Sequence, residues 1–188
     1  MPRPVEFFFD YASPFAYLAS EIIEKKLAGL EIIHRPIYLR GLEMFSKGLP
    51  FTANKAMYVV RDYLRCAEHE CVPTRVPSAF PINGLYATRG AVVAEQLGHF
   101  AAYHRAMFHA AFRDDRDISK KEVVVEVARD AGVDLGDRLD AAEVKEHLRA
   151  QTSAAEARGI FGVPSFFVGE ELFWGHDRLE FVGRAARD

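Results

Sequence analysis

The chain has 188 residues, of which 49% are hydrophobic and 27% charged, and its formal net charge is −3. This length predicts one domain with a core of its own. The nearly balanced charge gives no electrostatic attraction to nucleic acid or to an anionic membrane surface. The N-terminal residues show neither a leader pattern nor an apolar run of bilayer length, so we expect a cytoplasmic protein without nucleic-acid or membrane partners.

The first predicted elements are a strand over Val5 to Phe9 and a helix from Pro14 to about Lys26. Gly29 ends this helix, and Leu30 to Leu39 forms a second strand that Pro36 interrupts. A strand, a helix and a strand with short connections indicate a βαβ unit with parallel strands. Helix N–H groups point beyond the end of the first strand, which is where chemistry often takes place in α/β proteins.

A helical segment follows. The predicted helices are Thr52 to about Glu70, Asn83 to Leu97, Phe100 to Phe112, Val123 to about Ala131 and Glu143 to Arg158. Apolar residues follow one side of the first of them, namely Met57, Val60, Tyr63 and Leu64. Ser119 and Glu122 fit a capping box before the fourth.

The cysteines and histidines of this segment predict no metal site. On a helix, the step from Cys66 to Cys71 separates the side chains by about 140°, too far for a disulfide. Their spacing with His69 matches no common zinc pattern. We interpret both cysteines as free thiols. Three further histidines recur every five residues, so that no single helix face collects them: His99, His104 and His109.

The C-terminal residues predict two strands and a helix. The strands are Val163 to Val168 and Leu172 to Trp174, around a turn at Gly169–Glu170, and the helix begins at Asp177. A βαβ unit and a ββα unit separated by helices have the element order of the thioredoxin fold. We therefore predict an α/β protein with a thioredoxin-like domain of residues 1–41 and 159–188 and an all-helical insertion of residues 42–158.

Pro164 stands at the start of a strand, where proline is tolerated only at an edge or in a special geometry. A cis bond between Val163 and Pro164 would turn the N–H and C=O of Val163 outward, where an extended peptide could pair with them. An ordinary trans proline is the alternative, and the sequence leaves both open.

Four segments resemble the 2-hydroxychromene-2-carboxylate isomerases, a family related to kappa-class glutathione transferases and to DsbA-type thiol oxidoreductases. They are FFFDYASPFAYLAS (7–20), NKAMYVVRDYLR (54–65), FPIN (80–83) and GIFGVPSFFVGEELFWGHDRLEFV (159–182). The resemblance covers nearly the whole chain. It implies a homodimeric, glutathione-dependent isomerase of aromatic degradation that interconverts 2-hydroxychromene-2-carboxylate and trans-o-hydroxybenzylidenepyruvate.

The resemblance also implies a role for Ser13. The oxidoreductase relatives carry Cys-Pro-x-Cys where this chain has residues 13–16, Ser-Pro-Phe-Ala, so no thiol remains for disulfide exchange. A hydroxyl at a helix N-terminus can donate a hydrogen bond to the thiolate of a bound glutathione. The plain alternative is that Ser13 caps the helix, and both roles can hold. The thiolate would add reversibly to the unsaturated ketone and let its double bond rotate.

The other candidate residues follow from the same resemblance. The Val163–Pro164 edge would pair with the cysteinyl main chain of glutathione. The helix start at His176 and Asp177 would face the γ-glutamyl group, unless Asp177 is only a helix cap. Asn54, Lys55 or both would reach across the cleft to glutathione or substrate.

The substrate would meet a further set of residues. Tyr11 and Phe15 are candidate walls of an aryl pocket, with core packing as the alternative. The candidates for holding the small aromatic substrate's carboxylate or its enolate are Lys55, Asn83, Tyr11 and Arg89.

Three other functions stay open. A glutathione transferase, or another glutathione-dependent enzyme with a different electrophile, would have the same glutathione site. A disulfide oxidoreductase is disfavoured because Cys66 and Cys71 lie far from the Ser13 turn. A non-catalytic module could hold a peptide in the cleft, and saturable glutathione binding without turnover would indicate that function.

Overall fold

The structure is a computed structural model that describes residues 2–48 and 50–188. At its centre is a four-stranded sheet in the order β2-β1-β3-β4. The strands are β1 (Val5–Phe9), β2 (Ile32–Pro36), β3 (Ser165–Val168) and β4 (Glu171–Trp174). β1 is parallel to β2 and antiparallel to β3, which is antiparallel to β4. The parallel N-terminal unit and the C-terminal hairpin predicted from the sequence are therefore confirmed, and they share one sheet.

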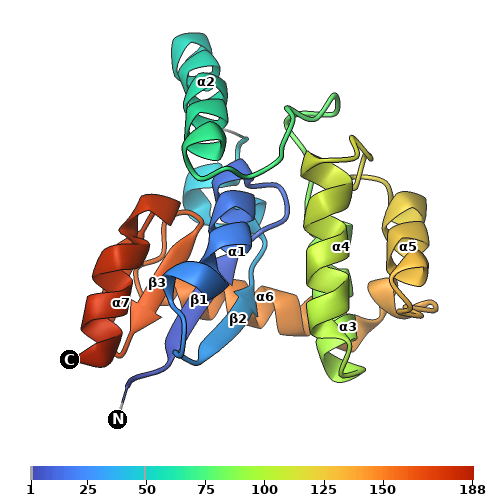
Figure 1. The fold of residues 1–188 in the computed structure, drawn as a ribbon. Coiled ribbons are helices and arrows are strands. Elements are labelled where there is room, and N and C mark those ends of the chain that lie inside the picture. The colour runs from blue at the N-terminus through green and yellow to red at the C-terminus, as the bar shows by residue number, and fades with distance from the viewer. Residues whose placement is uncertain (1, 49) are drawn as a thin grey trace.

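Seven α-helices surround the sheet in the described part of the chain. They are α1 (Pro14–Lys26), α2 (Ala53–His69), α3 (Leu85–Gln96), α4 (Phe100–Phe112), α5 (Lys121–Asp130), α6 (Ala142–Ala157) and α7 (Leu179–Arg187). Short 3-10 turns precede or join them: η1 (Leu39–Gly41), η2 (Glu43–Phe45), η3 (Arg138–Asp140) and η4 (His176–Arg178). Figure 1 shows α1 and α7 beside the sheet, α2 at the top, and α3, α4 and α5 together on one side.

The side chains of the central strand explain why it is an uninterrupted apolar run. Phe7 and Phe9 enter the larger core cluster, whereas Phe8 lies in a smaller cluster on the opposite face of the sheet. The same alternation places Phe166 and Phe167 of β3 in different clusters. Because both faces are covered, β1 carries apolar side chains on both sides.

Four local predictions need correction. The second strand ends at Pro36, because the N–H of Leu39 is taken by the Asp10 side chain at 2.6 Å. The capping box is wrong: α5 has Lys120 as its N-cap, and Ser119 Oγ instead accepts a hydrogen bond from the N–H of Asn83 at 2.9 Å. The C-terminal α-helix begins at Leu179 and not at Asp177, because His176–Arg178 form a 3-10 turn, and no side chain caps α7. The side of α2 that carries the apolar residues is mixed in burial, since Met57 is 58% exposed and Tyr63 only 2%, and α2 stands at the end of the molecule (Figure 1).

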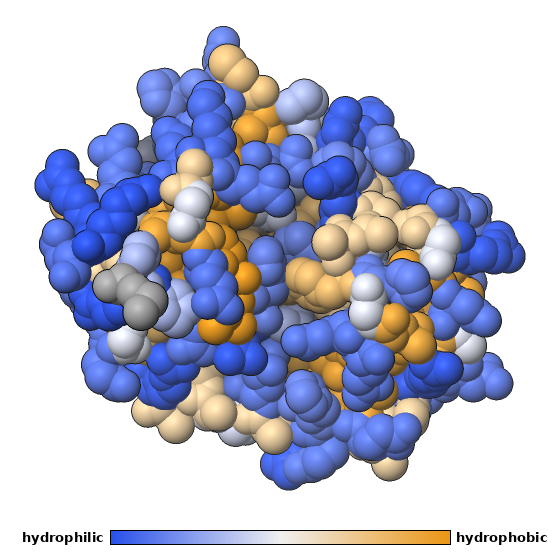
Figure 2. Space-filling model, turned by 60° about the horizontal axis from the view of Figure 1, so that its bottom comes forward, coloured by the Kyte–Doolittle hydropathy of each residue, from blue (hydrophilic) through white to orange (hydrophobic). Residues whose placement is uncertain are grey.

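The surface is mostly polar where it can be seen. Figure 2 shows one face on which hydrophobic side chains gather in separate patches between hydrophilic ones. Within the described residues, no helix has the length and apolar character that crossing a bilayer requires. The segment of residues 42–158 contains α2 to α6, and its status as a separate insertion domain stays a prediction.

Candidate active site

A mostly apolar cavity of about 510 Å³ lies where the chain passes from β1 to α1. Its walls come from this turn, from the loop after β2, from the first turns of α2, and from the loops before α3 and β3. The large apolar side chains that line it include Phe15, Phe45, Phe51, Phe80, Phe161 and Trp174. An aromatic ligand could be buried by such walls, provided that a few polar groups fix its orientation.

Ser13 is one of these polar groups. Its Oγ accepts a hydrogen bond from the N–H of Ala16 at 3.2 Å, so Ser13 is the N-cap of α1, and Pro14 occupies the first turn. The same Oγ donates to the carbonyl of Val163 at 3.3 Å. This donor bond is long, and the hydroxyl proton can rotate toward an anion in the cavity at small cost. The two roles considered for Ser13 are thus compatible in the structure.

The loop before β3 connects Ser13 to the start of the C-terminal helix. The peptide bond between Val163 and Pro164 is cis, which is the first of the two alternatives left by the sequence. Val163 lines the cavity, and the carbonyl of Pro164 accepts the N–H of Gly175 at 3.0 Å. Gly175 has a φ of 110°, a left-handed conformation that favours glycine.

His176 and Asp177 lie beside a second hollow, of about 460 Å³, that neighbours the first. Phe15 lines the first hollow and stacks, with ring centroids 5.3 Å apart, on His176, which lines the second. Burial lowers the pKa of His176, which is therefore a neutral imidazole at pH 7. Burial raises the pKa of Asp177, but the hydrogen bond from Arg178 at 2.5 Å and the positive charge of Arg178 together help to hold the pKa below its ordinary value.

Lys55 is the candidate on α2 that reaches the cavity. Its Nζ lies 4.6 Å from the centre of the Phe51 ring, and both residues line the cavity. Asn54 is exposed on the same helix turn and is not part of the lining. Asn83 does not line the cavity itself but contacts a residue that does. Its Oδ1 accepts a hydrogen bond at 3.1 Å from the hydroxyl of Tyr38, a lining residue.

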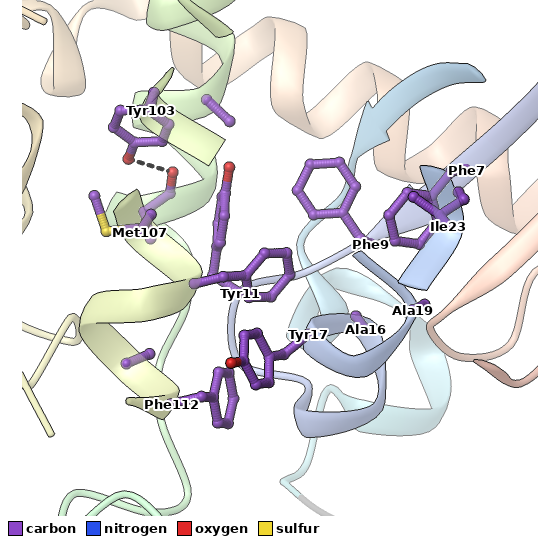
Figure 3. Close-up of a cluster of buried hydrophobic side chains, with 14 of the residues drawn as sticks. Phe7, Phe9, Tyr11, Ala16, Tyr17, Ala19, Ile23, Tyr103, Met107 and Phe112 are labelled. Carbon is purple, nitrogen blue, oxygen red and sulfur yellow. Dashed lines mark hydrogen bonds between the residues drawn. The ribbon is translucent and has the colours of Figure 1, made fainter. Parts of the chain in front are cut away.

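Two candidates from the sequence lie away from the cavity. The Tyr11 side chain is fully buried, and its hydroxyl bonds to Nδ1 of His104 at 3.2 Å. Figure 3 shows Tyr11 pointing into the core between β1 and α4, so the core-packing alternative describes it and the pocket-wall prediction was wrong. Arg89 is paired with Asp140 at 3.2 Å and does not line the cavity. Phe15 does line it.

Sequence reasoning missed Asp10, which is buried at the base of the cavity. Oδ1 accepts the N–H of Ala12 at 2.8 Å, and Oδ2 accepts the N–H of Leu39 at 2.6 Å. Burial raises the pKa of Asp10 to about 6, although these two N–H groups oppose the shift. The carboxylate thereby holds the Ser13 turn against the loop after β2. A charged residue directly after three phenylalanines was the available signal.

Sequence reasoning also missed Arg40, which reaches the cavity from η1. The cysteines lie elsewhere: Cys66 borders the second hollow, and Cys71 is exposed beyond the end of α2. Both are free thiols. His104 is buried and also bonds to Ser20 through Nε2 at 2.8 Å, which makes it a packing residue.

Comparison with known proteins gives a consistent picture. The family model described as a DSBA-like thioredoxin domain matches residues 4–186. A 2-hydroxychromene-2-carboxylate isomerase of Pseudomonas sp. (strain C18) is 30% identical over 191 residues, which cover 96% of this chain and 89% of the relative. Glutathione S-transferase kappa 2 of Caenorhabditis elegans is also 30% identical, over 96% of this chain and 90% of the relative.

A solved structure of a 2-hydroxychromene-2-carboxylate isomerase superposes with a TM-score of 0.81 at 26% identity. The match covers 96% of this chain and 93% of the other. Together with the family model, this match confirms the thioredoxin-like fold that the order of strands and helices predicted.

Proposed function

The chain belongs to the 2-hydroxychromene-2-carboxylate isomerase family of DSBA-like thioredoxin domain proteins, and we propose that it is a glutathione-dependent isomerase. The proposed reaction interconverts 2-hydroxychromene-2-carboxylate and trans-o-hydroxybenzylidenepyruvate. The observation that carries the proposal is Ser13, a hydroxyl at the N-terminus of α1 that faces an apolar cavity where redox relatives would place a cysteine.

The residues around Ser13 fit glutathione. The Ser13 hydroxyl and the N-terminus of α1 would hold the sulfur, and the main chain of Val163, next to Pro164, would pair with the cysteinyl unit. His176 and Asp177 would receive the γ-glutamyl end in the neighbouring hollow. The contacts that support this assignment are Ser13 Oγ to Val163 O at 3.3 Å, Pro164 O to Gly175 N at 3.0 Å, and the stacking of Phe15 on His176.

When bound, glutathione would supply a thiolate nucleophile that could add reversibly to the β carbon, so that the substrate's double bond would become a rotatable single bond. The chain's own part is to keep that sulfur anionic and to hold the substrate. Ser13 donates a hydrogen bond to the anion and lowers the pKa of the thiol. The aromatic walls bury the aryl ring, and Lys55 provides positive charge for the oxygen on which negative charge develops.

The test is an absorbance assay of trans-o-hydroxybenzylidenepyruvate with and without added glutathione. We expect isomerisation only with glutathione, and total free thiol should stay constant while many equivalents of substrate react. A rate that does not depend on glutathione would contradict the proposal.

A transferase is the second candidate, and the kappa-class relative at 30% identity favours it. In that case thiol would disappear in equal amount with an electrophile such as 1-chloro-2,4-dinitrobenzene, and the isomerisation assay would be negative. Glutathione binding without either reaction would indicate a binding module.

The oligomeric state and location belong to the same proposal, since we infer a cytoplasmic homodimer that serves aromatic degradation. Sedimentation velocity of the purified chain should give twice the monomer mass, and cell fractionation should recover it with cytoplasmic markers.

A further inference from the structure

The charges around the cavity are unbalanced. Arg40 and Lys55 both line it. Among the lining residues that the structure describes, Asp10 is the single acid, and both of its carboxylate oxygens already accept backbone N–H groups. An apolar cavity with two cations at its edge has the character of a site for an aromatic anion.

The guanidinium of Arg40 has donors that no described carboxylate takes up. Its one hydrogen bond to another residue in the described chain runs from Nη2 to the carbonyl of Ile82, at 3.5 Å, and no described carboxylate lies within ion-pair distance of its guanidinium. Arg89 and Arg178, by contrast, each bond to an aspartate. Arg40 is exposed at the cavity edge, so its guanidinium can meet an incoming ligand.

The backbone that carries Arg40 is fixed, although its side chain is free. Leu39 donates its N–H to Asp10 at 2.6 Å, and Gly41 donates its N–H to the carbonyl of Tyr38 at 2.9 Å. The same Asp10 carboxylate accepts the N–H of Ala12 at 2.8 Å, in the turn that leads to Ser13. The buried Asp10 side chain therefore fixes the backbone that carries Arg40 relative to the turn that carries Ser13.

We propose that Arg40 forms a subsite for the carboxylate of an aryl acid, with Asp10 as a positioning residue. The proposal rests on the isomerase function proposed above. It adds that the Arg40 guanidinium is the group that selects aryl acids over neutral aryl ketones. A guanidinium fits because its planar donors can hold a carboxylate bidentately, whereas the Lys55 ammonium, above the Phe51 ring, acts as a point charge.

The subsite is tested by binding without turnover. Calorimetric titrations of the parent with trans-cinnamate and with trans-cinnamamide compare an aryl acid with a neutral amide of the same shape. We expect the parent to bind cinnamate at least about tenfold more tightly, as a charge-assisted pair allows. Arg40→Gln should abolish the preference, and Arg40→Lys should keep part of it.

The matched control is Arg129→Gln, which removes the same charge from an exposed residue of α5 outside the cavity. It should leave the preference for cinnamate intact. Both glutamine variants should melt near the parent's temperature, because each side chain is exposed. The proposal is overturned if Arg40→Gln retains the preference, or if the parent has none.

Two further readouts separate this proposal from the isomerase function. Arg40→Gln should leave glutathione affinity unchanged while the KM for o-hydroxybenzylidenepyruvate rises about tenfold or more. A loss of glutathione affinity would assign Arg40 to glutathione and refute the aryl-acid subsite. If cinnamate binds through Arg40 but no isomerisation occurs, the isomerase function fails and the subsite stands.

Discussion

Gly84 gives the sharpest test of how the site is held. It is the N-cap residue of α3 with φ −75°, which any residue can adopt, so its backbone does not require glycine. A Cβ at this position would meet Asp10 Oδ1 at 2.0 Å and the N of Ala12 at 3.1 Å. In Gly84→Ala the carboxylate must retreat by about 1.4 Å to reach an ordinary 3.4 Å contact. Its bonds to the N–H groups of Ala12 and Leu39, at 2.8 and 2.6 Å, cannot both survive such a shift.

The magnitude follows from those bonds. Losing one hydrogen bond to a charged group costs about 1.5–3 kcal/mol, and overpacking of a dense region costs about 1–3 kcal/mol. We expect the free energy of unfolding of Gly84→Ala to fall by about 2.5–6 kcal/mol at pH 8, where Asp10 is ionised. The isomerisation rate of the folded fraction should fall as well, because Asp10 no longer fixes the Ser13 turn.

The assay is urea unfolding followed by the fluorescence of Trp174, the one tryptophan of the chain, together with the isomerisation rate. Gly132→Ala is the control: its φ of +77° disfavours alanine, but no atom lies within 4 Å of the added Cβ. It should cost about 1–2 kcal/mol and leave the rate per folded molecule unchanged. The reasoning is refuted if Gly84→Ala costs less than Gly132→Ala, or if it keeps the full rate.

Four further predictions follow from the same geometry. Ser13→Ala should remove a helix cap worth about 1 kcal/mol and lower kcat about ten- to hundredfold. A titration followed by thiolate absorbance should show a raised pKa of the bound glutathione thiol, and Ser13→Cys should not restore activity. Asp177→Asn should weaken glutathione binding by about 1–3 kcal/mol in calorimetry, while kcat at saturating glutathione stays near the parent's. Equal binding would leave Asp177 only its contact with Arg178 and no role toward glutathione. The double variant Cys66→Ser/Cys71→Ser should keep its glutathione-dependent rate, and a loss beyond about tenfold would mean that the chemistry is misplaced. Burial lowers the pKa of His34 from 6.5 to about 4. The fold is therefore stabilised by neutral His34 above pH 6.5, and this contribution of about 3 kcal/mol is lost as the pH falls toward 4. In urea unfolding at a series of pH values, His34→Phe should lose less stability than the parent over that range.

The parts of the fold that the sequence predicted are those set by local pattern. Helix α4 has the predicted bounds, Phe100 to Phe112, because its apolar residues keep helical spacing up to its end. Ser13 was predictable as an N-cap because its bond to the N–H of Ala16 spans only three residues. The strand at Phe7 to Phe9 was predictable because an apolar run of this length fits a doubly covered strand.

The errors concern contacts between distant parts of the chain. Ser119 was predicted to cap its own helix, but it bonds to Asn83, 36 residues away. Tyr11 and Arg89 have side chains suited to a site, but their partners are His104 and Asp140, on elements whose placement no local pattern gives. A residue type shows what chemistry a side chain can do, and only the packing of distant segments decides whether it faces the cavity.

Asp10 shows which long-range contact matters most for function. Its pKa is raised by burial from 3.8 to about 6, so its contribution to stability is fully present below pH 3.8 and is lost as the pH rises through 6. Above pH 6 the folded protein therefore carries a buried charge at a cost of about 3 kcal/mol relative to the unfolded chain. A neutral side chain would avoid that cost, but it could not accept two backbone N–H groups so strongly. The fold bears this cost at the turn that leads to Ser13 and at the loop that carries Arg40, and that placement supports the proposal that the Ser13 turn is the active site.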